Sequence, residues 1–268
     1  MSVLAEPWRD PAMVRALIEL LLLSLTAGTL GCWIVLYRHA YATEALAHAM
    51  LPGVVGATLL GLPLLAGGAV GAIAGAGAIA LARRSPLIDG PTAIAVATTT
   101  LLATGALLAT ADPASAELVE RLFGDLLGIG TAELVASGAL AIVTVVALGL
   151  AHHRLLATGF DRAAARTAGL RVARIELLVI VLAAVALLVA LHGLGNLLVV
   201  AILVGPALSA SRLSTRIAPM MASALALTAG CSVAGLYLAH FAAIPAAAAV
   251  ALVVVVVAVA IELRRPRR

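Results

Sequence analysis

Charged and aromatic side chains are scarce in this sequence. Only 11% of the 268 residues are charged and 3% are aromatic, and all 17 basic residues are arginine because lysine is absent. Soluble globular chains have about a quarter of their residues charged. This chain is instead 63% hydrophobic, with a mean hydropathy of +1.16. The composition excludes an ordinary soluble domain and indicates a polytopic membrane protein.

Two further absences narrow the function. A phosphate-binding Gly-x-x-x-x-Gly-Lys-Ser/Thr loop is missing from the sequence. The only cysteines, Cys32 and Cys231, lie far apart in apolar segments, which gives no zinc-ribbon spacing and predicts ordinary packing residues. The arginines flank apolar runs and form no patch interleaved with aromatic residues, which argues against nucleic-acid binding.

Nine segments are apolar enough to be expected as transmembrane helices, since about 20 apolar residues cross the hydrocarbon core. The seventh is short, and Gly61-Leu-Pro63 predicts a tight hairpin between the second and third. We therefore predict one all-α domain over residues 1–268, in contact with membrane lipid. The expected spans cover residues 14–36, 43–62, 64–82, 91–110, 131–150, 172–191, 196–211, 218–240 and 245–263.

The arginines fall unequally on the two sides that nine spans would define. Cytoplasmic loops of membrane proteins are enriched in Lys and Arg. One side receives three of the 17 arginines, namely Arg9, Arg15 and Arg121. The other fourteen fall on the opposite side: Arg38, Arg83, Arg84, Arg154, Arg162, Arg166, Arg171, Arg174, Arg212, Arg216, Arg264, Arg265, Arg267 and Arg268. This distribution predicts an external N-terminus and a cytoplasmic C-terminus.

Glu44 and His48 stand out because they lie inside the second expected span. Four residues apart on a helix, they share one face. An ionisable group in a membrane span costs about 2.5–3.5 kcal/mol or more, so it normally faces a bundle interior or a watery path. A carboxylate and an imidazole together can form half of a site for a divalent transition metal. Pro52-Gly53, one turn later, would kink this helix.

Two polar segments separate spans. The segment 111–130 is expected to form an outer helix capped near Asp112 or Ser115. The segment 151–171 predicts a short cytoplasmic helix that Asp161 caps and Gly169 ends, with Arg162 and Arg166 on its charged side. Near it, Glu176 is expected to pair with Arg171 or Arg174.

Four stretches together resemble the integral-membrane permease of the metal-ion ABC importers, from about residue 14 to 262. Glu44-Ala-Leu-Ala-His-Ala-Met-Leu-Pro-Gly53 is similar to the family's Asp-Ala-Leu-Ser-His-Ala-Val-Leu-Pro-Gly, with Glu in place of Asp. The other three occur in the family's order and on the expected sides. They are Leu122-Phe-Gly-Asp-Leu-Leu-Gly128, Gly159-Phe-Asp-Arg-Ala-Ala-Ala-Arg-Thr-Ala-Gly-Leu170 and Leu197-Leu-Val-Val-Ala-Ile-Leu-Val-Gly-Pro-Ala207.

The resemblance implies the large-importer (type II) fold of the cobalamin permeases, in a bacterial cell membrane. It implies a homodimer of permeases, two cytoplasmic ATP-binding subunits that hydrolyse ATP, and an extracytoplasmic metal-binding protein. Zinc or manganese, or iron as a third choice, would pass Glu44 and His48, and the permease would bind no cofactor tightly and would not be an enzyme. Residues 159–170 would form the coupling helix that contacts the ATPase, through Phe160, Asp161, Arg162, Arg166 and Gly169.

The roles expected of other polar residues are less specific. His192, His240 and Asp125 fall at expected outer ends, where they could belong to an outer gate; the alternative for each is an interfacial polar residue. Asp89 is expected to cap the fourth span.

Three other functions compete with metal import. A metal chelate or a cobalamin-like ligand would need a wider and less charged path through a similar fold. An ion-coupled secondary transporter would be expected to have internal repeats and broken helices, and no clear repeat is found. An intramembrane hydrolase using Ser209 or Ser211 with His240 lacks any nucleophile motif.

Overall fold

The structure is a computed structural model that describes residues 6–82, 89–110 and 124–264, although the side chains of residues 82, 192, 196 and 197 are not described. This part of the chain is helical and contains no β-strand. The outer helix expected near Asp112 or Ser115 lies outside the described residues. The helices are η2 (Pro7–Arg9), α1 (Pro11–Leu36), α2 (Ala40–Leu59), α3 (Leu64–Ala82), α4 (Gly90–Ala109), α6 (Thr131–Phe160), α7 (Arg162–Thr167), α8 (Val172–Leu213), α9 (Ile217–Ala242) and α10 (Ala246–Leu263).

Seven helices are long and apolar enough to cross a membrane: α1, α3, α4, α6, the first part of α8, α9 and α10. The two other expected spans also lie in helices. One is α2, which contains Glu44 and His48, and the other is the shorter apolar segment Leu198–Leu213. The all-helical membrane fold is therefore confirmed, and the count of nine crossings stays a prediction.

Aspartate caps and prolines begin two of these helices. The Asp10 carboxylate accepts a hydrogen bond from the Ala12 backbone N–H, and Pro11 occupies the first helical position of α1. Asp89 accepts from the Thr92 N–H in the same way at the start of α4, so the expected cap is confirmed. Both arrangements satisfy N–H groups that have no partner within the helix.

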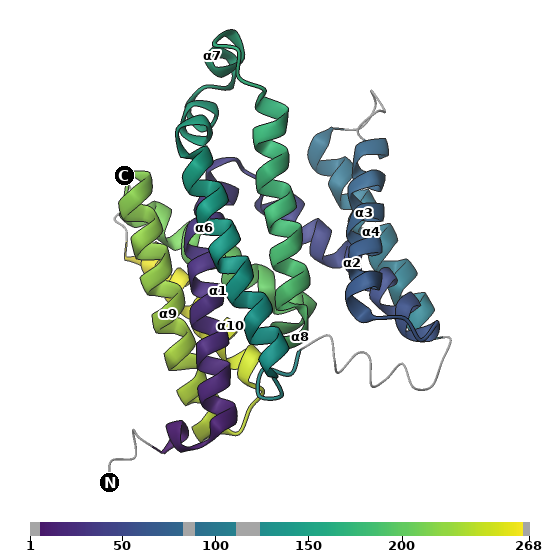
Figure 1. Ribbon diagram of the computed structural model, residues 1–268, viewed down its shortest axis with the longest axis vertical. Helices are drawn as coiled ribbons and strands as arrows, with labels where there is room; N and C mark the ends of the chain where they lie inside the picture. The colour runs from purple at the N-terminus through teal and green to yellow at the C-terminus, as the bar shows by residue number, and fades with distance from the viewer. Residues whose placement is uncertain (1–5, 83–88, 111–123, 265–268) are drawn as a thin grey trace.

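The helices form two groups, which Figure 1 shows side by side. One contains α2, α3 and α4, and the other contains α1, α6, α8, α9 and α10. Helix α1 lies at the centre of the larger group, where it packs against α6, α8 and α9 and buries Leu20, Leu30 and Trp33 completely. Helix α2 joins the two groups through its contacts with α8.

Helix α8 is broken at Gly195, whose φ of 71° and ψ of 163° are not helical. Residues 172–194 and 196–213 are therefore two helical segments, which match the sixth and seventh expected spans. The loop residue Gly124 lies against this break, and a Cβ there would overlap the backbone nitrogen of Gly195. With its φ of +73°, this position in the Leu-Phe-Gly-Asp motif requires glycine.

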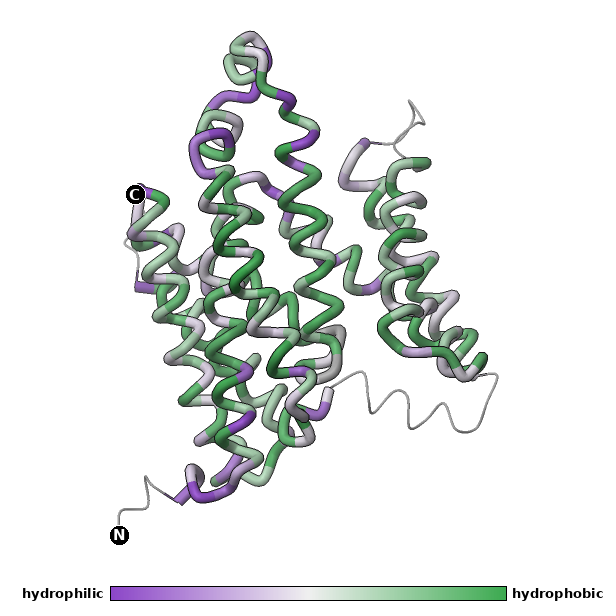
Figure 2. The backbone as a smooth tube through the Cα atoms, viewed as in Figure 1, coloured by the Kyte–Doolittle hydropathy of each residue, from purple (hydrophilic) through white to green (hydrophobic). Residues whose placement is uncertain are grey.

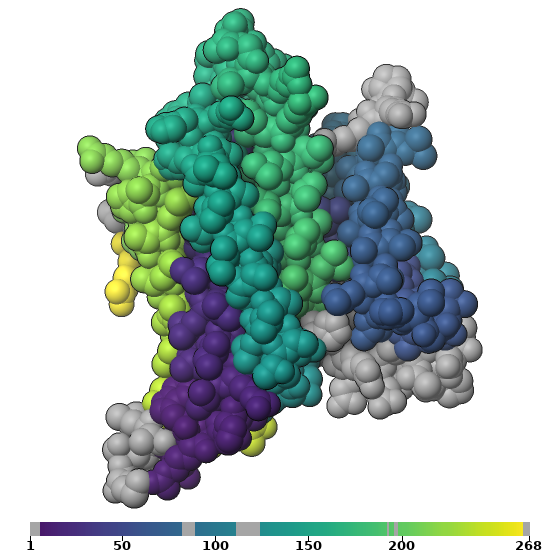
Figure 3. Space-filling model, in the orientation of Figure 1, coloured from purple at the N-terminus to yellow at the C-terminus, as the bar shows by residue number. Residues whose placement is uncertain are grey.

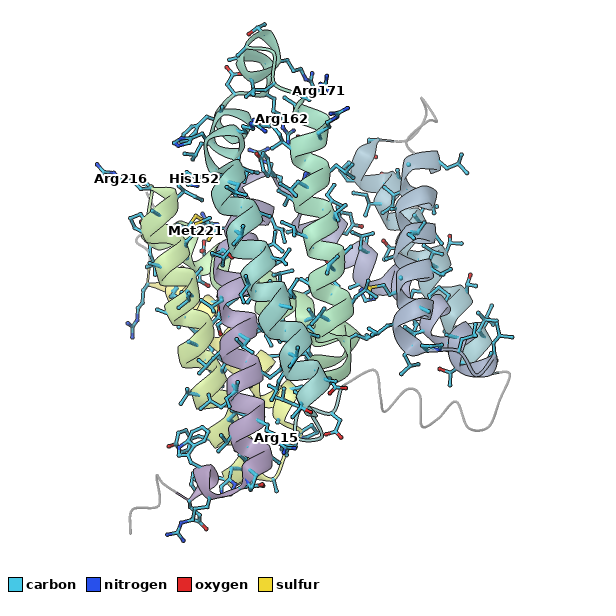
Figure 4. All side chains as sticks on the ribbon, in the orientation of Figure 1. Arg15, His152, Arg162, Arg171, Arg216 and Met221 are labelled. Carbon is cyan, nitrogen blue, oxygen red and sulfur yellow. The ribbon has the colours of Figure 1, made fainter. Side chains whose placement is uncertain are left out.

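Polar residues gather at the two ends of the long axis. The tube in Figure 2 is mostly hydrophobic along the helices and hydrophilic around α7 and near η2. Figure 4 labels Arg162, Arg171 and Arg216 towards the α7 end and Arg15 at the opposite end. This placement agrees with the two groups of arginines that the sequence predicts.

Candidate metal path

Glu44 and His48 lie one turn apart on the same face of α2. The distance from Glu44 Oε1 to His48 Nε2 is 4.0 Å, and the side chains are 53% and 20% exposed. The His48 Nδ1 atom is buried and has no hydrogen-bond partner among the described residues. One chain therefore presents a carboxylate and an under-satisfied imidazole together, which are two of the ligand types that zinc and manganese accept.

The pair opens onto a cavity of about 370 Å³ between α2 and the second segment of α8. Its lining is otherwise small and apolar, and consists of Ala47, Val200, Ala201, Val204 and Gly205. We call this cavity the α2–α8 groove. In the space-filling view, the surface of α2–α4 stands beside the surface of α8 with a furrow between them (Figure 3). Glu44 and His48 are the only ionisable side chains among the described residues of its lining.

The opposite face of α2 is fixed by close packing against α3. A Cβ at Gly53 would overlap the carbonyl oxygen of Gly67, and a Cβ at Gly67 would overlap the carbonyl oxygen of Gly53. Small residues at such positions let two membrane helices approach closely. Leu51 and Pro52 in turn contact Gly105 of α4. These contacts fix α2 against α3 and α4, while Glu44 and His48 line the groove.

Pro52 lies inside α2, which continues to Leu59. Proline has no N–H, so it cannot donate the helical hydrogen bond to the carbonyl group of His48, four residues earlier. The His48 carbonyl therefore loses the helical donor that residue 52 would otherwise supply.

The structure describes the side chains of two of the three candidates for an outer gate, Asp125 and His240. Asp125 accepts a hydrogen bond from the Gly128 N–H within its own loop. The exposed His240 ring packs against Phe241 at the end of α9. His192 lies in α8, three residues before the break, and its side chain is outside the described part of the structure. Among the residues described, no group of three or more His, Cys, Asp or Glu is placed to hold a metal.

The short helix predicted between residues 151 and 171 is present as α7. The Asp161 carboxylate accepts from the N–H groups of Ala163 and Ala164, at 2.8 and 3.0 Å. Gly169, with a φ of +82°, follows the last turn, where its N–H bonds to the carbonyl of Arg166. Phe160 is 83% exposed just before the helix, and Arg166 is exposed on it. The cap and the terminating glycine are therefore as the sequence predicts.

Arg162 is bound within the chain. Its Nε lies 2.9 Å from Glu176 Oε1, and its Nη2 donates to the carbonyl oxygen of Tyr37 at 3.3 Å. The expected pairing of Glu176 with Arg171 or Arg174 was wrong. Because α7 folds back over the start of α8, Arg162 reaches Glu176 although the two lie fourteen positions apart in sequence.

The ABC 3 transport family model matches residues 9–264. The chain belongs to the ABC 3 transport family. It is 28% identical to the manganese import system permease protein ScaB of Streptococcus gordonii over 226 residues, which cover 84% of this chain and 81% of ScaB. It is 29% identical over 241 residues to the chelated iron transport system membrane protein YfeC of Yersinia pestis, with 90% and 82% covered.

A solved relative has the same fold. In PsaBC from Streptococcus pneumoniae in complex with Fab, the matching chain superposes with a TM-score of 0.87 and 25% identity, over 98% of this chain and 95% of that one. The family and the resemblance that the motifs indicated are therefore confirmed, and this ABC 3 family member is a membrane transport protein.

Neither serine proposed for an intramembrane hydrolase is placed as a nucleophile. The hydroxyl of Ser209 donates to the carbonyl of Gly205, and that of Ser211 donates to the carbonyl of Leu208. Both bonds lie within α8, while His240 lies near the end of α9. This arrangement and the family membership give no support to the hypothesis of an intramembrane hydrolase.

The sequence interpretation missed a fully buried carboxylate of this family member. Glu19 lies within α1, is 2% exposed and accepts a hydrogen bond from Ser137 of α6. The signal that identified Glu44, an ionisable group inside an apolar span, also applies to Glu19. Glu19 is not in the lining of the α2–α8 groove.

Proposed function

We propose that this chain is the permease subunit of an ATP-driven importer for a divalent transition metal, with zinc or manganese as cargo and iron as a third choice. The observation that carries the proposal is the pairing of Glu44 and His48 in the α2–α8 groove. The names of ScaB and YfeC, relatives that handle manganese and chelated iron, support it.

A second copy of the permease would complete the path. Metal sites for zinc commonly use four ligands, and one chain offers two. Two copies facing each other across their grooves would supply two carboxylates and two imidazoles. A sparse set of this kind can bind an ion strongly enough for entry and weakly enough for release.

The other subunits would lie on opposite sides of a bacterial cell membrane. Two cytoplasmic ATP-binding subunits would contact the exposed surface of α7, formed by Phe160, Asp161, Arg166 and Gly169 with the half-exposed Arg162 at its edge. The C-terminus would be cytoplasmic and the N-terminus external, where a metal-binding protein would deliver the ion. Asp125, His192 and His240 remain proposed outer-gate residues. ATP binding and hydrolysis by the partners would switch the permease pair between outward and inward access.

The test is metal uptake into proteoliposomes that contain the permease with the ATPase and binding protein from the same locus. The Glu44→Ala/His48→Ala double variant should lower uptake of zinc or manganese at least about tenfold, because it removes the polar groups of the path. Size-exclusion chromatography should show unchanged assembly. Leu208→Ala, an apolar change on the exposed face of the second segment of α8 outside the groove lining, serves as the matched control. Normal uptake by the double variant would contradict the proposed path.

A metal chelate is the second candidate cargo, because YfeC is named for chelated iron transport. The same vesicles can be offered free manganese, free zinc and an iron chelate in parallel. Uptake of the chelate without uptake of either free ion would favour this second cargo.

A further inference from the structure

The turn between α1 and α2 is attached to the α7 end of the molecule through Arg162. This guanidinium group has two separate partners, the Glu176 carboxylate at 2.9 Å and the Tyr37 carbonyl oxygen at 3.3 Å. Arginine can hold two such partners at once because its N–H donors are fixed in a planar fork. Arg162, the first residue of α7, therefore connects this helix to the start of α8 and to the end of α1.

Tyr37 is well placed to transmit a displacement to α2. It ends α1, and only Arg38 and His39 separate it from the first residue of α2. Backbone N–H groups of residues 37, 38 and 39 all bond to carbonyls in the last turn of α1. Arg38 has a φ of 59°, a conformation that non-glycine residues seldom adopt, so this short connection is tightly defined. Glu44 follows within α2.

The side chain of Tyr37 fixes the same turn to α6. Its hydroxyl donates to the Leu155 carbonyl at 2.8 Å, and the residue is almost fully buried. Burial raises the pKa of the Tyr37 hydroxyl to about 12. The Tyr37 side chain thus attaches the turn to α6, and the Tyr37 backbone carbonyl attaches it to α7.

We propose that Arg162 and Glu176 are positioning residues that couple movement of α7 to the start of α2, and so to Glu44 and His48. This role rests on the proposed function, in which α7 is the contact with the ATPase. It differs from a docking role for Arg162, because both partners of the guanidinium lie within the permease. A half-exposed ion pair contributes little to overall stability, so the pair is expected to matter for geometry rather than for folding.

Hydrogen exchange in the permease alone tests the attachment without any transport. In nanodiscs, Arg162→Ala and Glu176→Ala should each speed the exchange of amides 37–42 by about fivefold or more, because the turn opens more often. Arg162→Lys keeps a charge for Glu176 but loses the fork, and should still speed exchange at the turn. Arg174→Ala is the matched control: Arg174 is an exposed arginine on the same turn of α8, with no ion pair among the described residues.

Transport in the full complex tests the coupling. Glu176→Ala should bind the ATPase subunits within about twofold of wild type, while the metal moved per ATP hydrolysed falls about tenfold in both Glu176→Ala and Arg162→Ala. Arg162→Lys should give an intermediate ratio of metal moved to ATP hydrolysed. These readouts separate coupling from folding and from docking.

Three results would overturn the proposal. Unchanged exchange at the turn in both alanine variants would show that no such attachment exists. Lost ATPase binding in Arg162→Ala with normal coupling in Glu176→Ala would make Arg162 a docking residue. An unchanged ratio of metal to ATP in both variants would refute the coupling. If the wild-type complex moved no metal, the proposed function would fail, and the exchange result would still stand.

Discussion

The hydroxyl of Ser137 on α6 donates a hydrogen bond to Oε1 of Glu19 on α1, and both side chains are buried. The second carboxyl oxygen of Glu19 has no partner among the described residues. A buried carboxyl group that keeps only one hydrogen bond is costly to disturb, because its neighbour then loses its partner as well. This pair connects two helices of the larger group, away from the α2–α8 groove.

Glu19→Ala is expected to destabilise the protein by about 2–3 kcal/mol, since it opens a cavity and leaves Ser137 unpaired. Glu19→Gln keeps an acceptor for Ser137 and should cost less than about 1 kcal/mol. Thermal unfolding with a thiol-reactive dye measures this directly, because Cys32 and Cys231 are both buried and free. Ser137→Ala supplies the second corner of a double-mutant cycle. Equal losses for the Ala and Gln variants would contradict the hydrogen-bond account.

The helical membrane fold could be predicted because apolar runs and arginine placement act locally. Seven of the expected spans are long apolar helices in the structure, and Asp89 and Asp161 cap the helices expected of them. The pairing of Arg162 with Glu176 could not be predicted, because it depends on how α7 folds back over α8. A charge pattern identifies which residues can pair, but tertiary packing selects the partner.

Helix α2 should be sensitive to the size of residue 53. Gly53→Ala is expected to cost about 1–3 kcal/mol, because the new methyl group would overlap the Gly67 carbonyl and push α2 from α3. The same dye assay measures the loss. Gly56→Ala is the matched control, since nothing lies within 4 Å of a Cβ there. That variant should be neutral or slightly stabilising, because alanine favours the helix by up to about 1 kcal/mol. A stable Gly53→Ala would contradict the close packing.

The Asp161 cap should matter for the partner that α7 contacts. Asp161→Ala removes the acceptor for two N–H groups and should destabilise this six-residue helix by about 1 kcal/mol. Fraying would weaken the proposed binding of the ATPase subunit by about fivefold, measured by titration of the purified subunit onto nanodiscs. Asp161→Asn keeps an acceptor and should bind nearly as wild type. If both variants bound the ATPase subunit equally well, the Asp161 cap would not be needed for α7 to bind it.

The sequence identified Glu44 and His48 but could not show what faces them. Their spacing on one helix predicts a shared face, and the structure adds the opposing segment of α8 across a cavity. That segment lies about 150 residues later in the chain and follows the break at Gly195, so no local pattern relates the two. Asp125 and His240 illustrate the converse, because their positions at expected outer ends give no group of three or more potential metal ligands among the described residues.

Filling the α2–α8 groove should block transport without unfolding the protein. Ala201 is a partly buried residue of the lining, so Ala201→Phe would place a ring against Glu44 and His48. Metal uptake into proteoliposomes is expected to fall at least about tenfold, while the thermal midpoint stays near that of wild type. Leu208→Phe, which enlarges an exposed side chain of the same segment outside the groove, should transport normally. Ala201→Ser, which adds little volume, should also retain uptake. Full uptake by Ala201→Phe would mean that the ion does not pass between α2 and α8, and Glu44 with His48 would then be a structural pair.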